Sequence, residues 1–293
     1  MTTELPGHTS TPDTSAAGAP ALAASTGRSK TLRNILLIAG SIIILAVLAT
    51  AAARVASALG REDTSGDFAV SGDFDTIDLR ATAADIVVGY GAVSQAELHF
   101  DQGDSNLTLG HSVSNGVLRI SVENGGWGWW GFGDWGFWNH EGARLGVVLP
   151  EGLEGDDVVL LLDTTAGNMQ IDGTFGDVRV ESTAGDVSLA GEAQNLEVRT
   201  TAGDVRLDGY RLNGSLSGDS TAGDTFYGFS SLPEAIDISS TAGNVTVELP
   251  DGDYRIETDT TAGEIRQDVS SDAGSDRLYR FETTAGDINI RER

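Results

Sequence analysis

The segment Val178–Leu189 reads VRVESTAGDVSL, and its pattern decides the fold of the chain. Apolar residues alternate with polar ones on both sides of a central Thr183-Ala184-Gly185 triplet. Alternation with period two is typical of strands with one buried face. Glycine permits a tight corner and the close approach of a neighbouring backbone. The segment therefore predicts two short strands joined at a glycine corner.

The same triplet recurs along the C-terminal half of the chain. Seven copies are present, with spacings between 18 and 23 residues. A Ser or Thr precedes every copy, and Asp, Asn or Glu follows it. A nearly fixed period of this length indicates a solenoid or another repeat array. The corner glycines are Gly167, Gly185, Gly203, Gly223, Gly243, Gly263 and Gly286.

Columns of like residues at every corner are what the stacking of parallel coils produces, so we predict an all-β parallel solenoid. Coils about 4.8 Å apart give a span of roughly 34 Å for seven of them. The Ser or Thr before each triplet is in phase with the apolar face, where stacked hydroxyls can hydrogen-bond along the axis. Variation in repeat length is expected in the opposite turns, such as those containing Asn213-Gly214 and Asp251-Gly252.

An antiparallel meander with hairpin turns at the triplets also explains the alternation. Neighbouring hairpins do not need identical corner residues, so the solenoid is favoured and the meander is the alternative. Upstream, residues 67–124 resemble divergent coils, in which Thr82–Ile86 is a degenerate copy with Ala84 in the glycine position. We expect this divergent part to cap one end of the stack, as solenoids require.

The N-terminal part of the chain predicts a membrane anchor. Residues 34–53 carry no charge and are long enough, at about 30 Å, to cross a hydrocarbon core. We therefore predict a disordered cytoplasmic tail at 1–30, a transmembrane helix at 31–58, a linker at 59–66 and one extracytoplasmic domain at 67–293. A cleaved signal peptide is the alternative, since Val55–Ala58 offers small residues at a possible cleavage site.

Charge is divided at the same boundary. The formal net charge of the 293-residue chain is −26, with +2 in residues 1–60 and −28 in the remainder. The basic residues before the apolar run place the N-terminus in the cytoplasm and the C-terminal bulk outside. Such an acidic chain lacks the basic footprint that nucleic acid requires. With no Cys, the chain has no disulfides or thiolate metal sites.

These features together resemble a known bacterial family. An N-terminal span followed by repeated Ser/Thr-Thr-Ala-Gly-Asp-Val-x-Leu strands is similar to the "putative adhesin" family of β-strand-repeat domains of unknown function, and to autotransporter-adhesin-like head domains. The resemblance covers about residues 67–293. It implies a right-handed parallel β-helix-like fold at the cell envelope, and it implies no catalytic residues.

An insertion at 125–140 contains all five tryptophans of the chain, spaced by glycines. Exposed aromatic side chains of this kind can bind sugar rings, a lipid interface or a protein partner. They can equally fold over an open solenoid end and form a cap. The aromatic residues of this candidate site are Trp127, Trp129, Trp130, Phe132, Trp135, Phe137 and Trp138.

A second candidate site is the column of residues that follow the triplets. Stacked carboxylates repel one another, and a divalent cation could bridge them with oxygen ligands. The alternative is that each side chain caps its own turn through a backbone hydrogen bond. The acidic members are Asp186, Asp204, Asp224, Glu264 and Asp287.

Catalytic motifs are not evident, and we predict no enzyme, cofactor or metal site. The four His are scattered without zinc-ligand spacing. The predicted function is that of a single-pass cell-membrane protein whose outer domain acts as an adhesin-like binding or envelope-contact module. Its expected partners are the membrane and an envelope glycan or surface protein. The alternatives are an envelope-stress sensor acting through residues 1–33 and, third, a carbohydrate-active enzyme.

Overall fold

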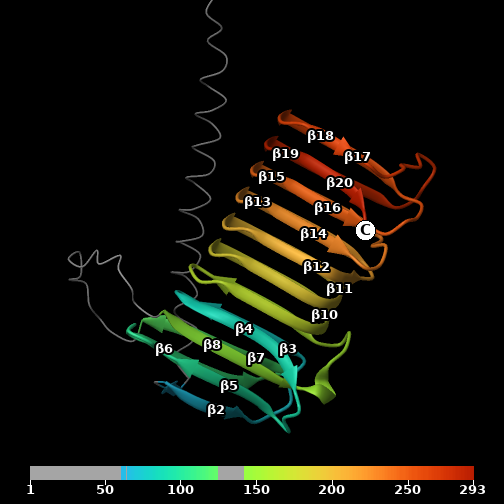
Figure 1. The fold of residues 1–293 in the computed structure, drawn as a ribbon. Coiled ribbons are helices and arrows are strands. Elements are labelled where there is room, and N and C mark those ends of the chain that lie inside the picture. Colours follow the sequence, from blue (N-terminus) through green and yellow to red (C-terminus); the bar gives the residue numbers. More distant parts are fainter. Residues whose placement is uncertain (1–60, 64, 125–141) are drawn as a thin grey trace, which may run out of the picture. The chain divides into compact units, whose positions relative to one another are not determined.

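The computed structural model describes residues 61–63, 65–124 and 142–293, which belong to one compact unit (Figure 1). No helix within these ranges is long and apolar enough to span a membrane. The predicted tail 1–30, the transmembrane segment 31–58 and the insertion 125–140 lie outside the described residues. Those three assignments therefore remain predictions.

The repeats form stacked levels. In each level one strand runs to the glycine corner and the next runs away from it, and equivalent strands of neighbouring levels pair in parallel. We call the first set the lead-in sheet. In spatial order it contains β7 (Val117–Asn124), β3 (Thr76–Ala81), β9 (Val159–Thr164), the second halves of β10 (Met169–Ala184) and β11 (Val187–Ala202), β13 (Ser215–Ala222), β15 (Ala235–Ala242), β19 (Leu278–Ala285) and β17 (Arg255–Ala262).

The strands that leave the corners form the lead-out sheet. The first halves of β10 and β11 belong to it, so these two 16-residue strands pass through both sheets. The parallel pairing confirms the solenoid and excludes the meander for these levels. The lead-out sheet contains β8 (Ala143–Pro150), β4 (Ala84–Gly91), β10, β11, β12 (Val205–Leu212), β14 (Thr225–Phe229), β16 (Val245–Leu249), β20 (Ile288–Glu292) and β18 (Ile265–Gln267).

The levels do not stack in sequence order at either end. Strand β3 lies between β7 and β9, although β7 follows β3 in the chain. At the other end β19 lies between β15 and β17, although β17 precedes it. Figure 1 shows β17 and β18 at the outer end, beyond β19 and β20. The spatial order of the levels therefore differs from the chain order, and the last parallel level at each end is formed by an internal segment.

Residues 67–124 also differ in part from the divergent coils that the sequence predicts. Strands β2 (Gly66–Val70), β5 (Ala96–Asp101) and β6 (Leu107–Ser114) pair antiparallel rather than forming coils. Within the predicted linker 59–66, β1 (Arg61–Asp63) pairs with β6. These antiparallel strands extend the two sheets at this end of the stack. A single 3₁₀ turn, η2 (Glu151–Leu153), follows β8.

The core lies between the two sheets, and the size of its side chains differs between the corner and the opposite side. The Ser or Thr before the triplet is buried at the corner in every level except the end one, where Thr260 is partly exposed; Thr164 and Ser182 are examples of the buried positions. Large aromatic side chains fill the opposite side, among them Phe175, Tyr210 and Phe229. Small residues at the corner and large ones opposite fill a coil that is narrow at one end, which is how close packing is reached.

The corner glycines are required by the stacking. At Gly203 φ is +127°, and a Cβ there would lie 2.2 Å from the carbonyl oxygen of Gly185 in the adjacent level. A real Cβ cannot approach a carbonyl oxygen this closely. At the equivalent position of the degenerate copy, Ala84 does not have the positive φ of Gly203, so its backbone conformation accepts a Cβ.

Candidate functional site

The corners form one edge of the solenoid, which we call the TAG edge: the seven Thr-Ala-Gly triplets with the residue after each. Its acidic column is a continuous hydrogen-bonded ladder. Each side-chain oxygen accepts the backbone N–H of the equivalent residue in the next level, at 2.8–3.0 Å. In spatial order the ladder runs Asp85, Asn168, Asp186, Asp204, Asp224, Asn244, Asp287 and Glu264.

This geometry corrects the prediction that each side chain caps its own turn. The Asp204 N–H donates to Asp186 Oδ1, and Asp204 Oδ1 accepts from Asp224. The position therefore requires a short side chain with an acceptor oxygen, which both Asp and Asn supply. Glu264 occupies the last level and has no further N–H to accept. The ladder also includes Asp85, which sequence reasoning recognised as part of a degenerate copy but did not assign to the column.

The cation row predicted on the same residues gains no support from this arrangement. One oxygen of each carboxylate within the ladder is already used by a backbone donor. Across the described ranges, no three His, Asp or Glu side chains are placed to hold a metal ion. The column acts instead as a tie between levels.

The buried hydroxyls beside the TAG edge bond to backbone rather than to one another. Thr164 Oγ1 donates to Ala166 O in its own turn at 3.1 Å, and Thr283 Oγ1 donates to Gly243 O of the adjacent level at 3.4 Å. The hydroxyls of Thr200, Ser220 and Ser240 have no hydrogen-bond partner in the structure. The predicted chain of hydroxyls along the axis is therefore not formed.

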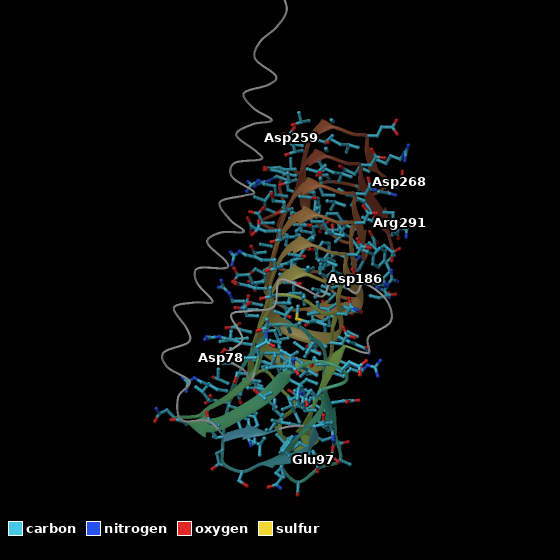
Figure 2. All side chains as sticks on the ribbon, turned by 90° about the vertical axis from the view of Figure 1, so that its left-hand side faces the viewer. Asp78, Glu97, Asp186, Asp259, Asp268 and Arg291 are labelled. Carbon is cyan, nitrogen blue, oxygen red and sulfur yellow. The ribbon has the colours of Figure 1, made fainter. Side chains whose placement is uncertain are left out.

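The outer face of the lead-in sheet carries a different kind of array, made of ion pairs across levels. Arg179 Nη1 lies 2.9 Å from Glu197 Oε2, and Arg199 Nε lies 3.4 Å from Asp219 Oδ2. Arg199 also contacts Glu197. Sequence reasoning did not single out these residues, although Arg and acidic residues at outward strand positions one repeat apart are the available signal. In Figure 2 the labelled Asp78 and Asp259 lie on this side, and Arg291 lies on the opposite side.

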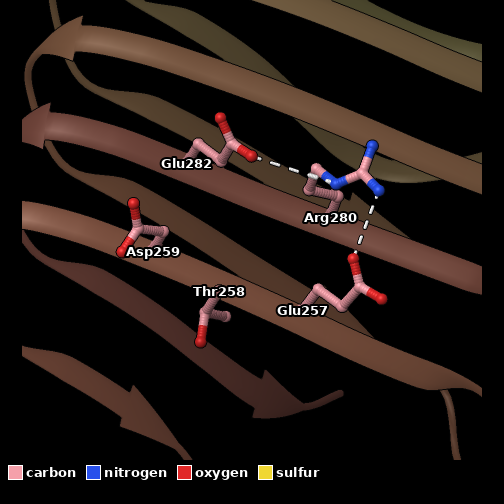
Figure 3. Close-up of a pocket in the computed structure, with 5 residues that line it drawn as sticks. All are labelled: Glu257, Thr258, Asp259, Arg280 and Glu282. Atoms are coloured by element: carbon pink, nitrogen blue, oxygen red, sulfur yellow. Dashed lines mark hydrogen bonds and ion pairs between the residues drawn. The ribbon is translucent and has the colours of Figure 1, made fainter.

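Two shallow depressions lie on this charged face. One is near the outer end of the stack, where Arg280 contacts Glu257 and Glu282 while Thr258 and Asp259 line the rest (Figure 3). The other includes Asp163, half-buried between two other carboxylates. Burial, followed by repulsion from Glu181 and then Asp78, raises the pKa of Asp163, and Arg80 partly opposes this. Its lining residues are Asp78, Arg80, Leu161, Leu162, Asp163, Arg179 and Glu181.

The predicted aromatic site cannot be placed, because Trp127, Trp129, Trp130, Phe132, Trp135, Phe137 and Trp138 lie outside the described residues. The structure does locate the ends of the insertion. It leaves β7 after Asn124 and returns to β8 at Ala143, where the other levels have their corner. The insertion therefore begins and ends at the side of the stack that carries the TAG edge.

A family model described as Toastrack DUF4097 matches residues 61–292. Among solved structures, the chain is similar to a "putative adhesin" from Parabacteroides merdae, with 11% identity, 78% of this chain and 95% of that chain covered, and a TM-score of 0.46. A "putative adhesin" from Bacteroides fragilis matches with 15% identity, 78% and 96% coverage and a TM-score of 0.44. A "putative cell adhesion protein" from Clostridium sporogenes matches with 13% identity, 80% and 100% coverage and a TM-score of 0.37. No curated protein matches the chain.

Proposed function

The chain belongs to the Toastrack DUF4097 family, and from this premise we propose that it is a non-catalytic, adhesin-like module that contacts the cell envelope or a neighbouring surface. In this proposal a single transmembrane helix at 31–58 anchors it, the N-terminus is cytoplasmic, and the coils wind right-handed outside the membrane. The words adhesin and cell adhesion in the names of the similar structures belong to those proteins.

One observation carries the proposal: the TAG edge repeats the same partly or fully exposed groups at seven levels. Each level presents a Thr and an Asp, Asn or Glu at the corner, and neighbouring strands lie about 4.8 Å apart. A row of equivalent shallow sites suits a partner that is itself repetitive, such as an envelope glycan or a surface protein array. Binding would then be multivalent, with many weak contacts adding to a usable affinity.

The test is binding of the full chain, in detergent micelles, to an array of envelope glycans and to isolated cell wall. The matched variants replace the partly exposed Thr183, Thr201 and Thr221 by Val, which keeps the β-branched shape and removes the hydroxyls. We expect retention by at least one glycan class and weaker retention of the triple variant.

Failure to bind any envelope fraction would contradict the adhesin-like role. Release of cleaved glycan, detected by mass, would favour the enzyme, and capture of a cytoplasmic protein by residues 1–33 would favour the sensor.

A further inference from the structure

The stack ends at the β17/β18 level, and this end is open. Inward positions in the level below are fully buried, as Tyr279 and Phe281 are. In the end level Thr258 and Thr260 are partly exposed and Ile265 is 42% exposed. The replacement of large apolar residues by Thr fits a level that meets solvent on one side.

The backbone of the end level also has free pairing capacity. Arg255 N–H donates to Arg277 O at 2.8 Å, so alternate residues from Arg255 face β19. In a parallel pair the residues between them point their N–H and C=O away, which places those of Thr258 and Thr260 on the free edge. By the same geometry, Ile288 N–H bonds to Glu264 O, so those of Ile265 and Gln267 face outward in the other sheet. Unpaired strand edges are templates for further pairing.

The described residues cover only half of this end. The Ile256 N–H, which faces the free edge, donates to Ser271 Oγ at 2.9 Å. Asp272 N–H donates to Tyr254 O at 2.8 Å in the same region. The segment 268–277 therefore protects the half away from the TAG edge. No residue within 61–63, 65–124 or 142–293 covers the half at the TAG edge, which contains Thr258–Thr260 and Ile265–Gln267.

We propose that this open half is an interface with a second copy of the chain, related by a two-fold axis parallel to the strands. Such an axis places β17 of one copy antiparallel to β18 of the other, twice, and joins open half to open half. The free-edge groups then match as hydrogen-bonded pairs: Thr260 with Ile265 of the second copy, and Thr258 with Gln267. Both seams continue the β-sheets, and the contact is isologous and closed.

The side-chain charges fit this register. The non-hydrogen-bonded pair between the two bonded pairs is Asp259 opposite Arg266 of the second copy. Both residues point outward from the sheets, and in the described part of the chain no cation pairs with Asp259 (Figure 3). Among the described residues, Arg266 forms its ion pair with Glu264, which ends the acidic ladder. A two-fold axis perpendicular to the strands and centred on Thr258 would instead pair β17 with itself and place Glu257 opposite Asp259 of the other copy, which is repulsive.

Disulfide trapping tests the register directly, because the natural chain contains no Cys. The double variant Asp259→Cys/Arg266→Cys, made in the full chain and oxidised in mild detergent, is expected to form a covalent dimer. Each single variant is expected to remain monomeric. The control Glu282→Cys/Asn289→Cys carries its thiols at the equivalent positions one level inside the stack, outside the proposed seams. A double variant that cross-links no more than this control overturns the proposal.

Charge reversal tests the same contact without cross-linking. Asp259→Arg or Arg266→Asp places like charges opposite each other at both seams, and either variant is expected to weaken dimerisation at least about tenfold in sedimentation. The double reversal Asp259→Arg/Arg266→Asp restores opposite charges and is expected to return the dimer. Circular dichroism confirms that each variant is folded. A chain that sediments as a monomer at all concentrations, or a double reversal that fails to rescue, contradicts the interface.

Discussion

The two edges of the solenoid connect neighbouring levels in different ways. At the TAG edge every level turns with the same residues, and the ladder from Asp85 to Glu264 ties each turn to the next. At the opposite edge, where lead-out strands return to the lead-in sheet, the ties differ from level to level. Tyr279 OH donates to Pro233 O at 2.7 Å in one place, and Leu212 N–H donates to Ser231 Oγ at 3.0 Å in another.

The difference follows from how closely the backbones approach. At the TAG edge a glycine Cα lies against the carbonyl of the adjacent turn, so each turn dictates the conformation of its neighbours. At the opposite edge the backbones approach as closely at some levels only: a Cβ at Gly191 would lie 2.1 Å from Gly173 O, whereas one at Gly252 would meet the Leu232 side chain. Register shifts also occur there, between Leu189 and Glu192 and between Leu207 and Tyr210. Repetition in the sequence therefore marks the edge where backbones touch at every repeat, and variation marks the edge where the contact changes from level to level.

The largest expected effect comes from changing the length of a turn. Inserting Gly-Ser between Ala202 and Gly203 shifts one corner out of every column, and we expect a loss of more than about 4 kcal/mol of unfolding free energy. The same insertion between Ala273 and Gly274, in the exposed long turn of the opposite edge, is expected to cost less than about 1 kcal/mol. Urea unfolding followed by circular dichroism measures both. Equal costs would remove the distinction between the edges.

A single methyl group at the corner comes next. Gly203→Ala places its Cβ 2.2 Å from Gly185 O at a φ of +127°, and we expect a loss of about 3 kcal/mol from strain and overlap. The matched control is Gly152→Ala, because a Cβ there has nothing within 4 Å. That variant should unfold within about 0.5 kcal/mol of the natural chain. A stable Gly203→Ala variant would show that the corners can separate.

The hydrogen-bonded ladder has a smaller effect. Asp204→Ala removes the acceptor for the Asp224 N–H, 2.8 Å away. The donor is then left without a partner, and we expect a loss of about 1–2 kcal/mol of unfolding free energy. Asp204→Asn keeps the acceptor and removes a charge from the column, so it should be as stable as the natural chain or more so. On the opposite edge, Asn195→Ala loses comparable bonds to Ser215 and should cost a similar amount. Similar costs would show that the edges differ in backbone contact rather than in hydrogen bonding.

Much of the fold could be predicted from the sequence because stacking requires the same residue types at every level. Alternation at Val178 and Val180 locates a strand, and the triplet that follows locates the corner. The buried Ser182 was predicted from its phase with the apolar face. These features are local, and each recurs often enough to be read without an alignment.

The order of the levels could not be predicted in this way. Every level carries the same pattern, so nothing in the repeat says that β19 lies inside β17. One signal exists in hindsight: Thr258 and Gln267 occupy positions where the next level has Phe281 and Ile290. Polar residues at inward positions mark an end level. The hydrogen-bond partner of each ladder residue could not be predicted either. An Asp that caps its own turn and an Asp that caps the turn of the next level occur in the same sequence pattern.

The smallest expected effect lies on the outer face between the edges, at Asp163. Its pKa is raised in the folded state, chiefly by burial and next by Glu181, so folding favours the protonated form. This stability is therefore present below the unfolded pKa of about 3.9 and is lost as pH rises through the folded pKa. Asp163→Asn should then raise the melting temperature at pH 7, by less than Asp204→Ala lowers it, and the gain should vanish below about pH 3.9. A gain that persists at low pH would mean that the carboxylate is not the cause, and that the outer face contributes to stability by packing rather than by charge.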